Sequence, residues 1–501
     1  MSLNVALPHP AGSLQFTSAA NRAHLSRLAK SGRAARLATG IYVVDGTLPP
    51  EALARHHSLA IAAEVWPGAV LCDRSGFAGP VPVDGWLYLC QPHLSRISDL
   101  RLPGLTISPR LGSGPCPGDI PLPDGLFQAG YARALVENIT TSGRPATGRP
   151  ARQAGTSAVE DRIDELARTG GAGRIRTVLT QLDVIAAHFD NRAVELVRSR
   201  LAAVLGSVSG DGPVSSRLRA RLAGQPYDEH RIQLVRSLVR TLDRTAPEPV
   251  PELGLPSRWQ WLPFFEAYFS NFIEGTEFGV DEARGIAVDG VVPPERPADA
   301  HDVVATYRLV SDPSVRSRTP ATADELLDML LEQHSILLAA RPDKRPGMFK
   351  DRPNYAGGYA FVAPELTEGT LRHGFTALDP LTDPFQRAVA LMFLITECHP
   401  FDDGNGRLAR IFSNAALTAG GQVRVIIPTV YRNNYLAALS GLSNQAGAGE
   451  SLIAVLRFAQ RWTARIDWSQ YDRAIEQLTG TSAFTDPGIA DRTGQRLILP
   501  N

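Results

Sequence analysis

The chain has 501 residues, of which 44% are hydrophobic and 20% charged, so it can bury the cores of about three globular domains. Lys and Arg number 51, as do Asp and Glu, and this zero net charge argues against a protein that coats nucleic acid or an anionic membrane with its whole surface. Four scattered cysteines exclude a disulfide framework, and without a CxxC pair we expect no zinc site. The N-terminus lacks the pattern of a secretory signal and no apolar run is long enough to span a bilayer, so we expect a cytoplasmic protein that does not bind membranes.

The first segment, about residues 1–155, is the basic part of the chain. It holds 14 Lys and Arg against 9 Asp and Glu, whereas the remainder holds 37 against 42. A helical pattern over 17–30, a Ser-Gly turn and a strand over 41–44 resemble the winged helix-turn-helix that opens abortive-infection antitoxins and related regulators. That resemblance implies a winged-helix-like α+β domain in which Arg33 and Arg36 contact DNA phosphates. A basic, solvent-exposed helix in an interaction domain fits the same pattern.

Linkers rich in Pro and Gly divide the rest of the chain, and one of them is expected over 141–155. After it, Ser157 and Glu160 have the spacing of a capping box, which predicts the start of a helix. The segments that we expect are a helical spacer over 156–245, a mainly helical domain over about 255–470, and a polar tail over 471–501.

The sequence HPFDDGNGRLAR, from His399 to Arg410, holds more candidate catalytic and phosphate-binding residues than any other stretch of the chain. An apolar helix over 384–397 is expected to end near His399, because the residue before a proline avoids the α region. A second helix is expected to begin at Asn405 or Gly406. The acidic, Gly-rich turn between the two helices would present backbone N–H groups to an anion at a helix N-terminus.

Several side chains of this stretch suit phosphoryl chemistry. Arg407 and Arg410 lie one turn apart, so both can reach one polyphosphate. Asp403 is placed to hold a divalent cation that bridges phosphates, whereas Asp402 is expected to be solvated. His399 is a candidate general base. A helix C-terminus favours the imidazolium form but a base must be neutral, and the sequence leaves this point open.

The stretch resembles the signature of the Fic family, HPFx[DE]GNGRxxR, at every specified position. The resemblance implies a mainly α fold, with a Fic-type helical core and a β-hairpin flap, that transfers AMP from ATP to a protein hydroxyl. It also implies that His399 deprotonates the target hydroxyl, that Asp403 binds Mg²⁺, and that Arg410 meets the γ-phosphate. The residues that would cradle the phosphates are Gly404, Asn405, Gly406 and Arg407. The branch that phosphorylates its targets has lysine at the position of Gly406, so glycine there favours nucleotidyl transfer.

A second stretch ends an aromatic helix that we expect over 261–275. Ser270 and Glu274 are one turn apart, so the hydroxyl can steady the carboxylate, and Gly275 is placed to end the helix. This stretch, SNFIEG, resembles the inhibitory motif of the same family, [ST]xxxE[GN], although the pattern is also typical of an ordinary helix end. The resemblance implies that Glu274 pairs with Arg410 and prevents productive placement of the γ-phosphate. In some relatives the same glutamate helps water to remove AMP.

Two further pieces resemble parts of that family. Residues 347–362, which include Gly358 and Tyr359, resemble the flap that aligns a target segment by β-augmentation, and an ordinary hairpin fits the pattern as well. Tyr435 matches an aromatic residue near the nucleoside, and a core tyrosine is the alternative.

We therefore expect a protein adenylyltransferase that uses ATP and Mg²⁺, modifies Ser, Thr or Tyr of an unknown protein, and is held inactive by Glu274. One alternative is a DNA-binding, antitoxin-like regulator whose Fic domain senses a nucleotide. Another is an enzyme that uses a different nucleotide donor or mainly removes AMP. The motifs identify neither the target, nor the trigger that displaces Glu274, nor the oligomeric state.

Overall fold

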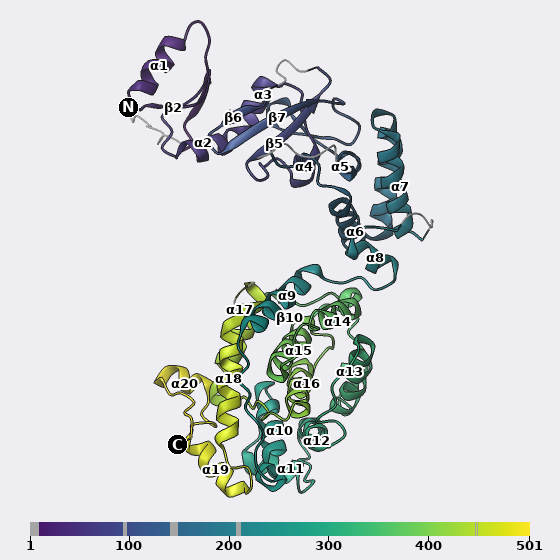
Figure 1. The fold of residues 1–501 in the computed structure, drawn as a ribbon, viewed down its shortest axis with the longest axis vertical. Coiled ribbons are helices and arrows are strands. Elements are labelled where there is room, and N and C mark those ends of the chain that lie inside the picture. The colour runs from purple at the N-terminus through teal and green to yellow at the C-terminus, as the bar shows by residue number, and fades with distance from the viewer. Residues whose placement is uncertain are drawn as a thin grey trace. The chain divides into compact units, whose positions relative to one another are not determined.

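The computed structural model of the protein describes residues 10–93, 98–140, 149–206, 212–445, 447 and 449–500. The chain divides into two compact units, Met1–Ala223 and Gly224–Asn501, which run from purple to teal and from teal to yellow in Figure 1. The first unit combines sheets and helices, and the second is helical apart from a short hairpin. In the described ranges, no helix is both long and apolar enough to cross a membrane.

The first unit opens with a small module of one helix and three strands. Its elements are β1 (Ser13–Phe16), α1 (Arg22–Lys30), β2 (Ala34–Ala38) and β3 (Ile41–Val44). The strands form an antiparallel sheet in the order β1-β3-β2, and Gly40 makes the turn between β2 and β3 with a φ of 83°. Within residues 10–44, α1 is the one helix, so the helix-turn-helix expected from the sequence is represented there by α1 and the β2–β3 hairpin.

A six-stranded sheet in the order β6-β7-β5-β4-β9-β8 follows, with four helices. Its elements are α2 (Pro50–His56), α3 (Ser58–Val65), β4 (Val70–Leu71), α4 (Asp73–Ala78), β5 (Trp86–Gln91), β6 (Leu100–Leu102), β7 (Leu105–Leu111), β8 (Ile120–Pro121), β9 (Phe127–Gln128) and α5 (Tyr131–Ile139). Side chains alternate between the two faces of β5. Leu87 and Leu89 pack in one core with Ile61 of α3, while Tyr88 and Cys90 belong to a separate cluster.

Three helices complete the first unit, namely α6 (Thr156–Ile185), α7 (Asn191–Val204) and α8 (Ser216–Leu222). Of the predicted linker before them, residues 141–148 lie outside the described residues. The capping-box prediction is wrong, because α6 begins after Gly155 with no side-chain cap hydrogen bond. The Glu160 carboxylate is instead buried, and Arg200 Nε donates to it at 2.7 Å. The position of the Glu160 carboxylate is therefore set by its ion pair with Arg200 of α7 and not by a local cap at the start of α6.

The second unit is built around two helices, α15 (Pro384–Cys398) and α16 (Asn405–Ala419), which pack along one another and share the largest apolar core. Both begin and end close to where the sequence predicts. Asp383 caps α15 by accepting a hydrogen bond from Gln386 N at 3.0 Å, and Pro384 fits the first helical position. The surrounding elements are α9 (Glu229–Arg244), α10 (Leu262–Ile273), α11 (Val280–Ala287), α12 (Pro297–Ser311), α13 (Ala323–Leu337), β10 (Tyr355–Ala356), β11 (Tyr359–Ala360), α14 (Thr367–Thr376), α17 (Arg432–Asn444), α18 (Gly449–Arg465), α19 (Tyr471–Gly480) and α20 (Pro487–Thr493).

Two boundaries in this unit differ from the sequence-based expectation. Helix α9, which falls inside the expected spacer over 156–245, packs against α14 and α15 and belongs to the second unit. The expected polar tail is also wrong, because Tyr471, Ala474 and Leu478 of α19 are buried in a cluster with aromatic side chains of α10. These three positions have helical spacing, but polar residues separate them, so the average polarity of the segment conceals a buried face.

Candidate active site

The loop between α15 and α16 gathers the HPFDDGNGRLAR residues. Helix α15 ends at Cys398, and His399 takes a left-handed conformation with a φ of 51°. Gly404 takes a φ of 79° directly before α16, at a point where a side chain would collide with Leu338. The loop therefore joins the C-terminus of one helix to the N-terminus of the next through two left-handed residues.

The His399 imidazole is held in one orientation. Its ring stacks on Phe361 with centroids 3.8 Å apart, and its Nδ1 lies 3.2 Å from Thr396 O. Because a carbonyl oxygen can only accept, Nδ1 carries the proton and Nε2 keeps a free lone pair. Burial lowers the pKa of His399 to about 4, so the ring is neutral at pH 7, as a general base must be. Desolvation thus outweighs the helix C-terminus, which is the point that the sequence leaves open.

Buried polar contacts hold this loop from both sides. Asn405 Oδ1 accepts from Phe401 N at 2.9 Å, and Asn405 Nδ2 donates to Phe401 O at 2.8 Å. His334 of α13 stacks on Phe401 with ring centroids 3.8 Å apart. Its Nδ1 accepts from Gly347 N at 2.9 Å, which leaves Nε2 to donate to Asp403 O at 3.2 Å. Asn405 is 1% exposed, so in this structure it shapes the loop through its own side chain.

The two adjacent acids differ in their surroundings. Asp402 is exposed, as expected of a solvated side chain, and it accepts two hydrogen bonds of 2.8 Å from Arg345, which lower its pKa. The Asp403 side chain is 37% exposed, and its Oδ1 accepts from Gly404 N at 2.6 Å and from Arg407 Nη2 at 3.3 Å. A partly exposed carboxylate beside a Gly-rich turn is a hard oxygen ligand, so the residues present fit a magnesium ion held by Asp403.

Arg407 lies differently from the predicted phosphate cradle. Its side chain is 2% exposed and pairs with Asp302 Oδ2 of α12 at 2.9 Å. Its Nη atoms also reach Asn271 Oδ1 at 3.5 Å and Asp403 Oδ1 at 3.3 Å. Asp302 is itself buried and accepts from Arg341 Nε at 3.0 Å. In this structure Arg407 therefore joins α16 to α12 and steadies Asp403.

Glu274 and Arg410 form the ion pair that the SNFIEG stretch implies. Arg410 Nη2 donates to Glu274 Oε1 at 2.7 Å and to Ser270 O at 2.9 Å, and Arg410 Nε donates to Ser270 Oγ at 2.9 Å. The Ser270 hydroxyl thus steadies the arginine, where the sequence led us to expect contact with the carboxylate. A Cβ added to Gly406 would collide with Glu274 Oε1, so this carboxylate lies against the first turn of α16. A helix N-terminus attracts anions, and Glu274 supplies one here.

Tyr435 and the flap residues lie beside the motif, because Tyr435 interacts with Arg410 and Tyr359 contacts Glu397 of α15. Tyr435 is 1% exposed and its hydroxyl lies 3.4 Å from Met392 Sδ, so it is a core residue in this structure, as the alternative reading of the sequence has it. Gly358 is exposed in the turn of the β10–β11 hairpin, where a target segment could approach it. The Tyr359 hydroxyl points inward to the Glu397 carboxylate, so this side chain anchors the hairpin.

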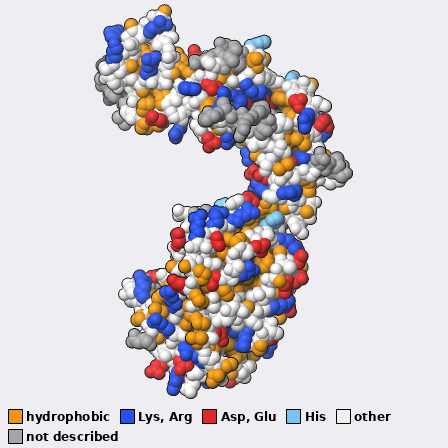
Figure 2. Space-filling view, in the orientation of Figure 1, with side chains coloured by type: hydrophobic (Ala, Val, Ile, Leu, Met, Phe, Trp, Pro, Cys, Tyr) orange, Lys and Arg blue, Asp and Glu red, His pale blue; other side chains and the backbone are white. Residues whose placement is uncertain are grey.

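Arg33 and Arg36 are exposed beside and on β2. Cationic side chains outnumber anionic ones over this module on the face that Figure 2 shows. Arg33 Nη2 pairs with Asp45 Oδ1 at 3.1 Å, and Arg36 Nη2 donates to Thr39 Oγ1 at 3.3 Å. Contacts of this kind at the surface are weak, so both guanidinium groups can turn toward another anion.

Several residues outside the motif hold the site. Phe361 lies in the stretch over 347–362 that resembles a flap, whereas the sequence gives no spacing that connects His334 or Asp302 to the motif. Phe361, His334 and Asp302 act through the contacts described above. Lys350 is 4% exposed, and its Nζ donates to Asn354 Oδ1 at 2.8 Å and to Cys398 O at 3.3 Å. Burial lowers the pKa of Lys350 to about 8. Two signals in the sequence point to Lys350, its place in the flap-like stretch over 347–362 and its rarity, because the chain has only three lysines.

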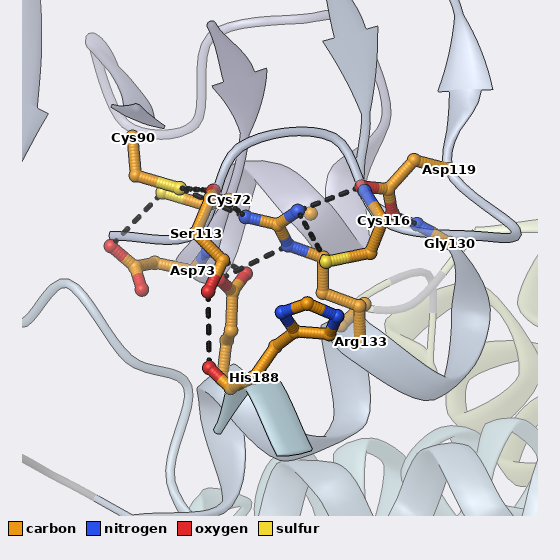
Figure 3. A network of polar contacts seen from close by, with 12 residues as sticks. Cys72, Asp73, Cys90, Ser113, Cys116, Asp119, Gly130, Arg133 and His188 are labelled. Carbon is orange, nitrogen blue, oxygen red and sulfur yellow. Dashed lines mark hydrogen bonds and ion pairs between the residues drawn. The ribbon is translucent and has the colours of Figure 1, made fainter. Parts of the chain in front are cut away.

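A second cluster of titratable groups lies in the first unit (Figure 3). Arg133 at its centre is 1% exposed and donates to Asp119 Oδ2 at 2.7 Å, to Cys90 Sγ at 3.0 Å and to Glu137 Oε1 at 3.2 Å. Asp73 is also buried, and Arg110 and Arg152 donate to it at 2.9–3.2 Å. Cys72, Asp73 and Glu137 are close enough to surround a cation. Because the facing arginines already neutralise both carboxylates, we assign this cluster to the stability of the unit.

The helix hairpin, its left-handed loop and the adjoining β-hairpin define a Fic-type core, in agreement with the resemblance of the motif. A sequence profile of the Fic/DOC family matches residues 324–417, from the start of α13 to the last turns of α16. This match to the Fic/DOC family covers the two core helices and the loop between them.

Known proteins also resemble this chain over part of its length. A Caenorhabditis elegans protein named protein adenylyltransferase fic-1 is 30% identical over 185 residues, which are 35% of this chain and 36% of that protein. A Nematostella vectensis protein named protein adenylyltransferase Fic is 26% identical over 210 residues, 40% of this chain and 47% of that protein. The chain thus spans between a third and a half of the length of these relatives.

Solved structures of Fic proteins also match. A fragment of Fic-1 from C. elegans is 17% identical, with 64% of this chain and 88% of that chain covered and a TM-score of 0.36. A Fic domain containing signaling protein from Bacteroides thetaiotaomicron is 20% identical, with 54% of this chain and all of that chain covered and a TM-score of 0.35.

Proposed function

We propose that the protein is an adenylyltransferase that transfers AMP from ATP to a Ser, Thr or Tyr hydroxyl of another protein. The observation that carries this proposal is the neutral His399 imidazole, whose Nε2 is free, in the loop that leads into the N-terminus of α16. The relatives named as protein adenylyltransferases, which match 35–40% of this chain, support it.

In the proposed reaction, the polyphosphate of ATP lies against the backbone N–H groups at the start of α16. His399 Nε2 accepts the proton of the target hydroxyl, whose oxygen forms a bond to the α-phosphorus in line with the departing group. The bond from the α-phosphorus to the bridging oxygen breaks, and its electron pair leaves with pyrophosphate. Asp403 would hold Mg²⁺, which supplies charge neutralisation at the phosphates when it is bound. Arg407 and His334 keep Asp403 and its loop in place.

We further propose that Glu274 holds the enzyme inactive. Its carboxylate takes the anion position at the first turn of α16 and occupies Arg410, which the γ-phosphate would otherwise meet. Two anions at one helix N-terminus repel each other, so ATP can bind productively only when Glu274 moves away.

The test is labelling of proteins in a lysate with α-labelled ATP and Mg²⁺. Glu274→Gly is expected to raise labelling at least tenfold over the natural protein, while Glu277→Gly, which removes an exposed acid three residues further on, leaves it unchanged. Adding His399→Ala to Glu274→Gly should abolish the signal. Labelling that survives this second substitution, or no labelling by Glu274→Gly, would contradict the proposal. A parallel reaction with α-labelled UTP identifies a different donor, and loss of label from pre-labelled protein identifies AMP removal.

A second candidate function is DNA binding by the first unit, favoured by the exposed guanidinium groups of Arg33 and Arg36. A gel shift with genomic fragments should weaken as salt rises, because phosphate contacts release counterions. Replacing both arginines by glutamine should reduce the affinity at least tenfold. Binding that is unchanged in this variant would remove the reason for the proposal.

A further inference from the structure

The chain enters the second unit along α14. Asp228 N donates to Thr370 Oγ1 at 2.9 Å, and the rings of Tyr227 and His373 lie 4.1 Å apart. The entering segment is therefore docked on α14 before α9 begins at Glu229. Two residues later, Arg231 leaves α9 toward the base of the β10–β11 hairpin.

Arg231 is the centre of a buried clamp under this hairpin. Its Nη1 donates to Glu397 Oε1 at 2.5 Å and to the Tyr359 hydroxyl, and its Nη2 donates to Ala360 O. The guanidinium carbon lies 4.5 Å from the centre of the Tyr359 ring, within the range of a cation–π contact. The Tyr359 hydroxyl donates in turn to Glu397. One guanidinium thus holds both the side chain and the backbone of β11.

Glu397 completes the clamp from α15, two residues before His399. It is 2% exposed, and its second oxygen accepts from Ser443 Oγ of α17 at 2.5 Å. A carboxylate buried this deeply needs a cation, and Arg231 is the one that contacts it among the described residues. The clamp therefore joins four elements, α9, α15, α17 and the β10–β11 hairpin.

We infer that Arg231 is a positioning residue that sets the hairpin, and through it His399, for the target protein. Phe361 lies two residues after Tyr359 and stacks on the His399 ring, so movement of β11 would move the support of the imidazole. The exposed outer edge of the hairpin is where a target segment would add as a strand. This inference rests on the proposed function for its effect on labelling, while the clamp itself can be tested without activity.

The experiment compares Arg231→Met with Arg236→Met in the Glu274→Gly protein. Arg236 is on the same helix, is 44% exposed and pairs only with Glu229 among the described residues. In Arg231→Met, amide hydrogen exchange over residues 353–362 is expected to rise at least tenfold, lysate labelling to fall at least tenfold, and ATP affinity to change less than twofold. Arg236→Met should change none of the three.

Two further variants separate positioning from simple loss of stability. Arg231→Lys keeps the charge and should restore part of the labelling. Arg231→Met combined with Glu397→Gln removes the unpaired buried charge, so it should recover thermal stability while the hairpin still exchanges fast. Unchanged exchange in Arg231→Met, or ATP affinity that falls in parallel with labelling, would overturn the inference. If Glu274→Gly labels nothing, the proposed function fails, and the exchange measurement still decides whether the clamp exists.

Discussion

Glu274 Oε1 accepts a hydrogen bond from Arg410 Nη2 at 2.7 Å, although the two residues are 136 positions apart in the chain. The Arg410 side chain is 6% exposed and that of Glu274 is 26% exposed, so the acid is the movable member of the pair. Ser270 supplies two further acceptors to the same guanidinium and keeps it in place when the acid leaves. Arg410 is therefore ready for another anion without rearrangement of its own.

The space beside Gly406 provides the first prediction. Gly406→Ala would place a methyl group against Glu274 Oε1, so we expect it to weaken the Glu274–Arg410 pair and lower the free energy of unfolding by about 1–3 kcal/mol. In the Glu274→Gly background the methyl group has room, so the same substitution should be nearly neutral. Urea denaturation of the natural protein, the two single variants and the double variant measures the coupling energy between positions 406 and 274, which should exceed about 1 kcal/mol.

Gly404→Ala is the matched control for that cycle. Its left-handed φ of 79° and its approach to Leu338 are independent of Glu274. It should destabilise the protein equally in both backgrounds. Equal effects of Gly406→Ala in both backgrounds would mean that the acid does not lie where the structure places it.

The second prediction concerns pH. Because burial lowers the pKa of His399 to about 4, labelling by Glu274→Gly should stay level from pH 8 down to about 5.5 and fall only below that. Lys350 lowers the pKa of His399 while Glu274 and Asp403 raise it, so loss of Glu274 removes one group that raises this pKa. Initial rates with Mg²⁺ in excess check the profile, with intrinsic fluorescence to confirm the fold at each pH. An inflection near pH 6.5 would show a solvated imidazole.

The same shift predicts how stability depends on pH. The unfolded histidine has a pKa near 6.5, so between about pH 6.5 and 4 the unfolded state binds more protons than the folded state. His334, whose pKa burial also lowers to about 4, acts in the same direction. The contribution of these two histidines to the free energy of unfolding should therefore be at its maximum above pH 6.5 and decrease as the pH falls toward 4. Urea denaturation of the natural protein and of His334→Gln should show a shallower decrease in the variant.

The sequence predicts the site where local rules determine the structure. Pro400 and the glycines mark the ends of two helices, and those ends lie close to where they are expected. The spacing of Glu274 within its helix, combined with the family resemblance, predicts its partner Arg410, and the structure has that ion pair. Such features depend on the nearest few residues or on a motif that fixes many positions at once.

Contacts between residues that are far apart in the chain could not be predicted from the sequence. Asp302 and Arg231 reach the site from helices remote in sequence, and each looks like an ordinary helix residue in its own segment. Arg407 illustrates the consequence, because its place in the motif suggests a phosphate ligand whereas burial pairs it with Asp302. For Glu160, tertiary packing likewise overrides a local capping pattern.

The third prediction tests the Arg407–Asp302 pair. Both side chains are at most 2% exposed, so Asp302→Ala leaves a buried guanidinium without its main partner and should lower the free energy of unfolding by about 3–5 kcal/mol. Asp299→Ala, one turn earlier on α12 and 27% exposed, should lower it by about 1 kcal/mol or less. Combining Asp302→Leu with Arg407→Met removes both charges and should recover most of the loss. A double variant as unstable as Asp302→Ala would contradict an assignment to electrostatic pairing.

The last prediction concerns the C-terminal helices. They pack against the aromatic side chains of α10, the helix that ends at Glu274. The Tyr471 ring lies 5.1 Å from Trp261 and 5.8 Å from Phe265, and its hydroxyl donates to Asp281 at 2.8 Å. Tyr471→Ala should therefore lower the free energy of unfolding by about 3 kcal/mol, whereas Glu476→Ala on the exposed side of α19 should change it by less than about 0.5 kcal/mol.

Because α10 also carries Glu274, loosening this aromatic contact should let the acid leave Arg410 more often. Tyr471→Ala is then expected to raise labelling several-fold in the natural background at a temperature where it stays folded. In the Glu274→Gly background no acid remains to be displaced, so the same substitution should not raise labelling further. An equal rise in both backgrounds would show that the C-terminal helices act on the enzyme by a route other than the position of Glu274.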